Sequence, residues 1–79
     1  MRLGKLRKQL IDELRNDGLP VASLTQNTIS EKIGLCRLSV ILFEKKHTSE
    51  FNILNYLIYL KRNSNITWEE IGEFLERDN

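Results

Sequence analysis

The sequence of 79 residues predicts a single all-α domain. Apolar residues recur every three or four positions in several segments, which is the spacing of amphipathic helices, and no segment shows a sustained alternation of apolar and polar residues. Glycine, proline and capping residues separate these segments. The apolar share of 41% is enough for a compact but thin core, and dimerisation is a natural supplement for so short a chain. We expect five helices in one domain over residues 1–79.

The first helix is predicted to end near Asn16. Gly18 suits the position after a helix, and Pro20 cannot continue one. Four leucines, with Ile11 beside them, form the apolar face: Leu3, Leu6, Leu10 and Leu14. The segment "GLPVASL" is then predicted to be a loop.

Two short helices follow, with a glycine between them. Thr25 can cap a helix over residues 26–33, and the next helix is predicted over residues 37–45. Gly34 suits the turn because glycine takes positive φ without a Cβ penalty. Ser30 is small enough for the place where the two helices nearly touch. The positions predicted to be buried are Ile29, Ile33, Leu35, Val40 and Phe43.

Two further helices complete the domain. Ser49 can cap the fourth helix. The inward stripe of that helix is predicted to be Phe51, Leu54, Leu57 and Ile58. The fifth helix has the clearest start signal, because Thr67 and Glu70 form a capping box, and Ile66 with Ile71 occupies the two positions of a hydrophobic staple.

Charge is unevenly distributed along the chain. Residues 1–17 hold five basic and three acidic side chains, and residues 18–48 hold four and two, so each segment has a net charge of +2. Residues 49–79 hold three basic and six acidic side chains, a net charge of −3. One end of the molecule is therefore suited to a polyanion that the other end would repel.

Three features indicate a cytoplasmic protein. The first ten residues lack the apolar region of a secretory signal. The densest apolar stretch, residues 53–60, is far shorter than the roughly 20 residues of a membrane span. The single cysteine, Cys36, excludes an internal disulfide framework and fits a reducing compartment. Cys36 and His47 are too few ligands for a metal site, and we expect no cofactor and no catalytic activity.

The segment over about residues 25–45 has the pattern of a helix-turn-helix unit. With Gln26 as its first position, the predicted buried positions are all apolar and the tight turn falls on a glycine. On these residues the chain resembles the Cro/CI-like family of phage and bacterial repressors, also called the Xre family. The matching residues are "LTQ" at 24–26, Gly34, Leu35, Arg37, Val40 and Glu44. The resemblance covers roughly residues 2–60 and implies a five-helix, lambda-repressor-like fold.

The resemblance also implies that the helix over residues 37–45 enters the major groove of double-stranded DNA. Gln26 would bind a phosphate, and Arg37 would read guanine, because its guanidinium matches O6 and N7. The residues expected to contact DNA are Gln26, Asn27, Arg37, Leu38, Ile41, Leu42, Lys45 and Lys46. Lys5 and Lys8 of the first helix are candidates for further phosphate contacts.

The chain departs from the family pattern in three places. The reading positions Leu38, Ile41 and Leu42 are apolar, so they would contact thymine methyl groups or else a protein partner. Alternatively, helix packing or a dimer contact buries them. Cys36 stands where Ser or Thr normally caps the third helix, and the loop before the unit is longer than usual. Glu44 is expected to form a structural ion pair. A protein-interaction module on the same scaffold, such as an antitoxin-like subunit, is the alternative function.

The C-terminal helix, over about residues 67–77, is expected to form a homodimer interface. The residues expected there are Trp68, Ile71, Phe74 and Leu75. Alternatively, this helix packs onto its own domain and uses part of that surface. Its acidic side chains are expected to face away from DNA. The sequence thus predicts a dimeric DNA-binding regulator of transcription, most simply a small repressor of phage or mobile-element type, associated with the nucleoid of a bacterium.

Overall fold

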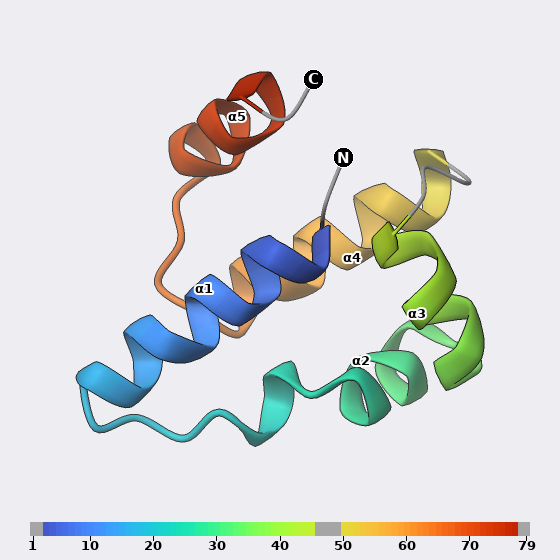
Figure 1. The fold of residues 1–79 in the computed structure, drawn as a ribbon, viewed down its shortest axis with the longest axis horizontal. Helices are drawn as coiled ribbons and strands as arrows, with labels where there is room; N and C mark the ends of the chain where they lie inside the picture. The colour runs from blue at the N-terminus through green and yellow to red at the C-terminus, as the bar shows by residue number, and fades with distance from the viewer. Residues whose placement is uncertain (1–2, 46–49, 78–79) are drawn as a thin grey trace.

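The computed structural model describes residues 3–45 and 50–77, and within these ranges the chain forms five α-helices, one 3-10 turn and no strand (Figure 1). The helices are α1 (Leu3–Asn16), α2 (Gln26–Ile33), α3 (Arg37–Lys45), α4 (Glu50–Arg62) and α5 (Trp68–Arg77). The all-α class is confirmed, and the bounds of α2 and α3 agree with the prediction. The 3-10 turn η1 (Ala22–Leu24) lies in the segment predicted to be a loop. The predictions for Lys46, His47 and Ser49 lie outside the described residues.

One core joins all five helices. In Figure 1, α2 and α3 lie at one end of the molecule, and α5 lies across α1 from α2. The buried apolar side chains are Leu3, Leu6, Leu10, Leu14, Leu24, Ile29, Val40, Ile53, Tyr56, Leu57, Leu60, Ile66, Ile71 and Phe74. The four leucines predicted for the first helix are among them. None of the described helices is both long and apolar enough to cross a membrane.

Local capping residues define the ends of α2. The side chain of Thr25 accepts a hydrogen bond from the backbone nitrogen of Thr28 at 3.3 Å, as a helix N-cap does. At the other end, Gly34 has a φ of 75°, in the left-handed region. The chain therefore leaves α2 in a tight turn and begins α3 at Arg37. Ser30, where α2 was predicted to approach α3, is buried, and its hydroxyl donates to the carbonyl of Asn27.

The predicted capping box of α5 is confirmed. The backbone nitrogen of Glu70 donates to the hydroxyl of Thr67 at 3.1 Å, and the backbone nitrogen of Thr67 donates to the carboxylate of Glu70 at 3.2 Å. Both staple residues, Ile66 and Ile71, are buried in the core. The start of α5 is thus fixed by contacts within six residues and by the core beneath them.

The predicted inward face of α4 is wrong at Leu54. This leucine is 53% exposed, and Ile58 is half-buried, whereas the buried side chains are Ile53, Tyr56, Leu57 and Leu60. The side chain of Phe51 lies outside the described residues, as does that of Phe43 in α3. Because α4 carries apolar residues on more than one face, their spacing alone does not select the face that packs inward.

The positions predicted to be buried in the helix-turn-helix unit follow the prediction where they are described. Ile29 and Val40 are fully buried. Ile33 and Leu35 are half-buried and pack against the core. The unit therefore rests on the core through α2 and through the inner face of α3.

Substitutions at two glycines are expected to have opposite effects on stability. A Cβ atom would meet no atom within 4 Å at Gly34 or at Gly72, so neither change causes a collision. Gly34→Ala should nevertheless cost about 1–2 kcal/mol, because alanine is strained at positive φ. Gly72→Ala should stabilise the protein by up to about 1 kcal/mol, because Gly72 lies inside α5 without positive φ. Urea denaturation of both variants measures the two effects, and a stabilising Gly34→Ala would contradict the assigned turn.

Candidate nucleic-acid interface

One face of α3 lies outside the core. Leu38 is 64% exposed and Leu42 is 55% exposed, while Ile41 is half-buried. Val40 and Glu44 are buried on the opposite side of the same helix. The face that was expected to read DNA is therefore accessible along most of the helix.

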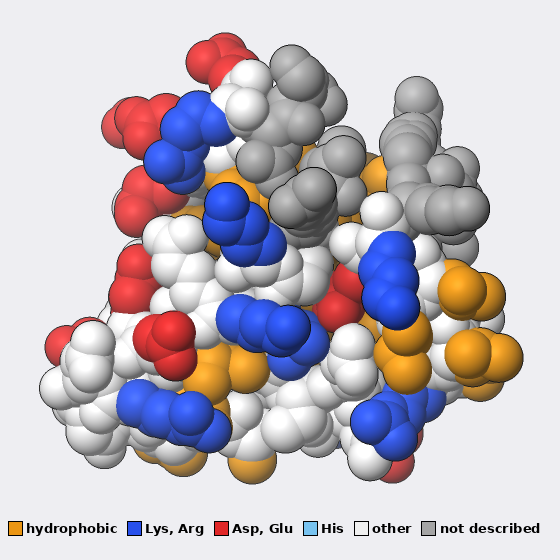
Figure 2. All heavy atoms as spheres, viewed as in Figure 1, with side chains coloured by type: hydrophobic (Ala, Val, Ile, Leu, Met, Phe, Trp, Pro, Cys, Tyr) orange, Lys and Arg blue, Asp and Glu red, His pale blue; other side chains and the backbone are white. Residues whose placement is uncertain are grey.

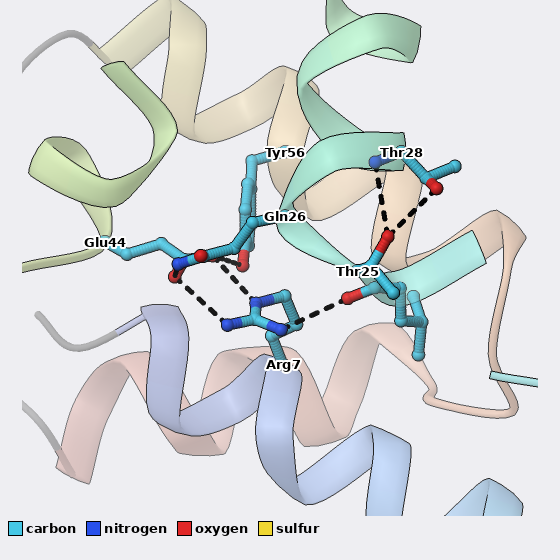
Figure 3. Close-up of polar contacts among 7 residues, drawn as sticks. Arg7, Thr25, Gln26, Thr28, Glu44 and Tyr56 are labelled. Carbon is cyan, nitrogen blue, oxygen red and sulfur yellow. Dashed lines mark hydrogen bonds and ion pairs between the residues drawn. The ribbon is translucent and has the colours of Figure 1, made fainter. Parts of the chain in front are cut away.

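A buried carboxylate holds α3 in this orientation. The carboxylate of Glu44, a residue only 6% exposed, accepts hydrogen bonds from three side chains (Figure 3). The donors are Arg7 Nε at 2.9 Å, Gln26 Nε2 at 2.9 Å and the hydroxyl of Tyr56. We call these four residues the Glu44 cluster. Its members come from α1, α2, α3 and α4, so one carboxylate joins four helices.

Burial makes the partners of Glu44 necessary. Arg7 is also buried, and its Nη1 donates to the carbonyl of Leu24 at 3.2 Å. Each buried side-chain nitrogen and oxygen atom of the described residues has a hydrogen-bond partner. Burial is the main cause that raises the pKa of Tyr56 far above its ordinary value, and the negative charge of Glu44 is the second. The hydroxyl of Tyr56 therefore remains protonated and donates its hydrogen bond. The ion pair of Arg7 with Glu44 is the structural pair expected for Glu44.

A glycine lets α1 approach this cluster closely. A Cβ atom at Gly4 would lie 3.0 Å from Glu44 Oε1, closer than ordinary van der Waals contact. Gly4 is half-buried and lies one turn before Arg7 on α1. The absence of a side chain at this position therefore leaves the space that the carboxylate of Glu44 occupies.

Beside the Glu44 cluster lies a groove with a volume of about 470 Å³. It runs between α1, α2 and α3, and we call it the α1–α3 groove. Its lining residues are Gly4, Lys5, Arg7, Lys8, Gln26, Ile41, Glu44 and Lys45. Lys5, Lys8 and Lys45 are exposed, and none of them forms an ion pair with a described residue. Figure 2 shows basic side chains over both α1 and α3 on this face, and apolar side chains at its edge over α3.

The structure brings some of the predicted contact residues together. Gln26, Ile41 and Lys45 line the α1–α3 groove. Asn27 and Arg37 are exposed near the starts of α2 and α3, and they do not line the groove. One N–H group of the Gln26 amide donates to Glu44, so only the remaining N–H group and the oxygen are available to a ligand. The expected site is therefore an accessible helix face bordered by a basic groove.

The sequence-based prediction missed the roles of Arg7 and Tyr56. Arg7 lies four residues after Leu3 and three before Leu10, which places it on the leucine face of α1. A basic residue on a buried face requires an acidic partner, so the position of Arg7 could have predicted a buried ion pair. Tyr56 lies three residues after Ile53 and four before Leu60 in α4, so it shares their face. The second apolar face of that helix made this pattern ambiguous.

Cys36 marks the start of α3. Its carbonyl accepts a hydrogen bond from the backbone nitrogen of Val40, and its exposed thiol lies 3.1 Å from the hydroxyl of Ser39. Hydrogen bonds from Ser39 lower the pKa of the thiol. Cys36 therefore occupies the capping position that the sequence assigned to it.

The four residues expected at a dimer interface do not share one environment. Ile71 and Phe74 are buried in the core of their own chain, and Leu75 is half-buried against that core. Trp68 is 54% exposed. Most apolar side chains of α5 therefore pack against the core of their own chain, and Trp68 is the exposed one. Four carboxylates of α5 are also exposed: those of Glu69, Glu70, Glu73 and Glu76.

When compared with known proteins, the chain matches no family model, no curated protein and no solved structure at a significant level. The resemblance to the Xre family therefore rests on the residues of this sequence alone.

Removing one charge of the central ion pair should destabilise the protein strongly. Arg7→Met leaves Glu44 buried without its cation, so the free energy of unfolding should fall by about 3–5 kcal/mol. Combining Arg7→Met with Glu44→Leu should cost much less than the sum of the two single losses, because no unpaired charge then remains. Urea denaturation of the single and double variants measures this coupling. Additive losses would show that the pair does not act as a unit.

The stability of the protein should depend on Tyr56 in alkaline solution. The pKa of Tyr56 is higher in the folded protein than the value of about 10 in the unfolded chain, so folding keeps a proton that the unfolded chain releases. Stability is therefore lost as the pH rises above about 10. Thermal unfolding of the unmodified protein and of Tyr56→Phe between about pH 8 and 11 measures how much of the pH dependence of stability comes from Tyr56. The Phe variant should start less stable but lose less with rising pH, and parallel curves would contradict the assignment.

Proposed function

We propose that this protein is a sequence-specific DNA-binding regulator of transcription, in which α2 and α3 form a helix-turn-helix unit within a lambda-repressor-like domain. The observation that carries this proposal is the exposed face of α3 beside a groove with three lysines that form no ion pair with a described residue. A major groove about 12 Å wide admits one α-helix. The lysines beside that helix suit the phosphates on the rim of the groove.

In this proposal the exposed residues of α3 recognise DNA in two ways. Recognition helices read bases mainly with their N-terminal residues, so Arg37 reads a guanine. Leu38 and Leu42 follow on the exposed face and contact the methyl groups of thymines. Arg37 thus selects a G·C pair through hydrogen bonds, and the leucines select A·T pairs through apolar contacts.

The α1–α3 groove provides the phosphate contacts. Because one N–H of the Gln26 amide is held by Glu44, the rest of the amide is oriented in a groove that also holds Lys45. Lys5 and Lys8 extend the basic surface from α3 onto α1. Each phosphate that a lysine neutralises releases counterions, so affinity should fall steeply with salt.

The proposed regulator acts as a homodimer in the bacterial cytoplasm, bound to the nucleoid. Trp68 is the exposed apolar residue of α5 around which a second copy would pack. The exposed carboxylates of α5 favour an orientation in which this helix faces away from DNA (Figure 2). A two-fold dimer would place two copies of α3 at half-sites about 34 Å apart.

One observation favours a second candidate, a protein-interaction module. Leu38 and Leu42 are both more than half exposed, and hydrophobic side chains of this kind on one helix face also suit a protein partner. In that case the basic groove would bind an acidic surface of the partner, and the chain would show little affinity for DNA.

Replacing Arg37 should lower affinity for one DNA sequence only. Duplexes enriched from a random pool supply the specific site, and fluorescence anisotropy measures binding. Arg37→Ala should weaken binding to the enriched duplex by about 1–3 kcal/mol and leave binding to random duplex nearly unchanged. The matched control is Arg15→Ala, an exposed arginine in the last turn of α1, which should change neither affinity. Equal loss on both duplexes would exclude Arg37 as the base-reading residue.

The same assay distinguishes the two candidate functions. A DNA-binding protein loses affinity for random duplex steeply as salt rises, and Lys45→Ala should reduce the slope by about 1. A protein-interaction module should show little binding at any salt concentration, and that result would exclude the proposed function.

A further inference from the structure

A second groove, with a volume of about 260 Å³, lies between α2 and α4. It shares no lining residue with the α1–α3 groove. Its lining residues are Lys32, Ile33, Asn55, Ile58, Tyr59 and Arg62. We call it the α2–α4 groove.

Three of the six lining residues give this groove an apolar part, and that part is held in place. Its four residues from α4 are spaced by three and four positions, so they share one face of that helix. Tyr59 donates its hydroxyl to the carbonyl of Ser23 at 2.6 Å, which fixes its ring. Ile33, Ile58 and Tyr59 are half-buried, and Ile33 and Tyr59 pack against the core. A ligand would meet a preformed apolar surface here.

The polar groups of the groove are mainly hydrogen-bond donors. Lys32 and Arg62 lie in the last turns of α2 and α4, are exposed, and form no ion pair with a described residue. The half-buried side chain of Asn55 makes no hydrogen bond to the described part of the chain. Among the described side chains, none that lines the groove is acidic. Two cations and an amide without a carboxylate select for an anion.

We propose that the α2–α4 groove binds a small organic anion, in which a carboxylate or phosphate is joined to an apolar group. Lys32 and Arg62 hold the charged end, and the guanidinium of Arg62 matches two oxygens of either anion. Ile33, Ile58 and Tyr59 contact the apolar part. Since pockets for drug-sized ligands usually measure about 300–1,000 Å³, this groove suits a smaller ligand with one ring or a short chain.

The groove is placed where such a ligand would affect α3. Lys32 and Ile33 are the last residues before Gly34, the turn that connects α2 to α3. A ligand that joins this end of α2 to α4 would favour one position of the turn over others. We therefore assign the ligand the role of an effector of DNA binding. This role rests on the proposed function, whereas binding of the anion does not.

Chemical-shift titration of the ¹⁵N-labelled full chain tests the site directly. Benzoate and phenyl phosphate are the probes, and acetate and inorganic phosphate supply the same charged groups without a ring. The probes should cause saturable shifts in residues of the groove, with a midpoint on the order of 1 mM. The ringless anions should need at least about tenfold more. Comparing benzoate with phenyl phosphate shows which anion the groove prefers.

Variants of the two cations complete the experiment. Lys32→Ala and Arg62→Ala should each raise the midpoint at least about fivefold. The matched control is Lys61→Ala, because Lys61 is the neighbour of Arg62 in α4 and does not line the groove. The dispersion of the amide signals reports whether each variant is folded. Shifts that do not saturate, or that concentrate at Lys5, Lys8 and Lys45, would overturn the site.

DNA binding provides an independent readout. At a saturating concentration, the preferred probe should change the affinity of the unmodified chain for duplex DNA about fivefold or more, and should have no such effect on Arg62→Ala. If the chain binds the anion but binds no DNA, the proposed function fails and the site stands. If it binds both and the affinities are independent, the effector role is overturned.

Discussion

The structure depends on the buried carboxylate of Glu44. An ion of this kind inside a protein loses its hydration, and only partners of complementary charge and geometry offset the loss. Arg7, Gln26 and Tyr56 supply those partners from three other helices, so each helix must lie where its donor reaches the same two oxygen atoms. An apolar contact in the same place would tolerate small displacements. The carboxylate therefore sets the relative positions of four helices more narrowly than the hydrophobic core alone would.

The exposed surface of α3 follows from the same interaction. Glu44 and Val40 fix the inner side of the helix, which leaves Leu38 and Leu42 in solvent. Because Arg7, Gln26 and Glu44 belong to the Glu44 cluster and also line the α1–α3 groove, the interaction that fixes the fold also shapes this surface. A rigid connection of this type suits a binding helix, since a surface that presents fixed groups loses less conformational entropy when it binds.

The parts of the fold that local chemistry determines were predictable from sequence. Thr25 and Gly34 set the ends of α2, and the capping box sets the start of α5, each through contacts between near neighbours. The inward face of α4 was not predictable from its spacing, because Leu54 and Ile53 are equally apolar. The two grooves depend on distances between helices: Lys32 and Arg62, for example, are thirty positions apart in the chain. Such a site can be recognised only when the tertiary structure is known.

The exposure of Trp68 has a consequence for spectroscopy. Trp68 is the only tryptophan of the chain, and its indole is more than half in water while the core lies beneath the neighbouring residues of α5. Its fluorescence in the native state should resemble that of the solvated fluorophore, so emission would change little when the core melts. The same property makes it a sensitive reporter of docking, since a molecule that covers α5 would shift the emission toward the blue.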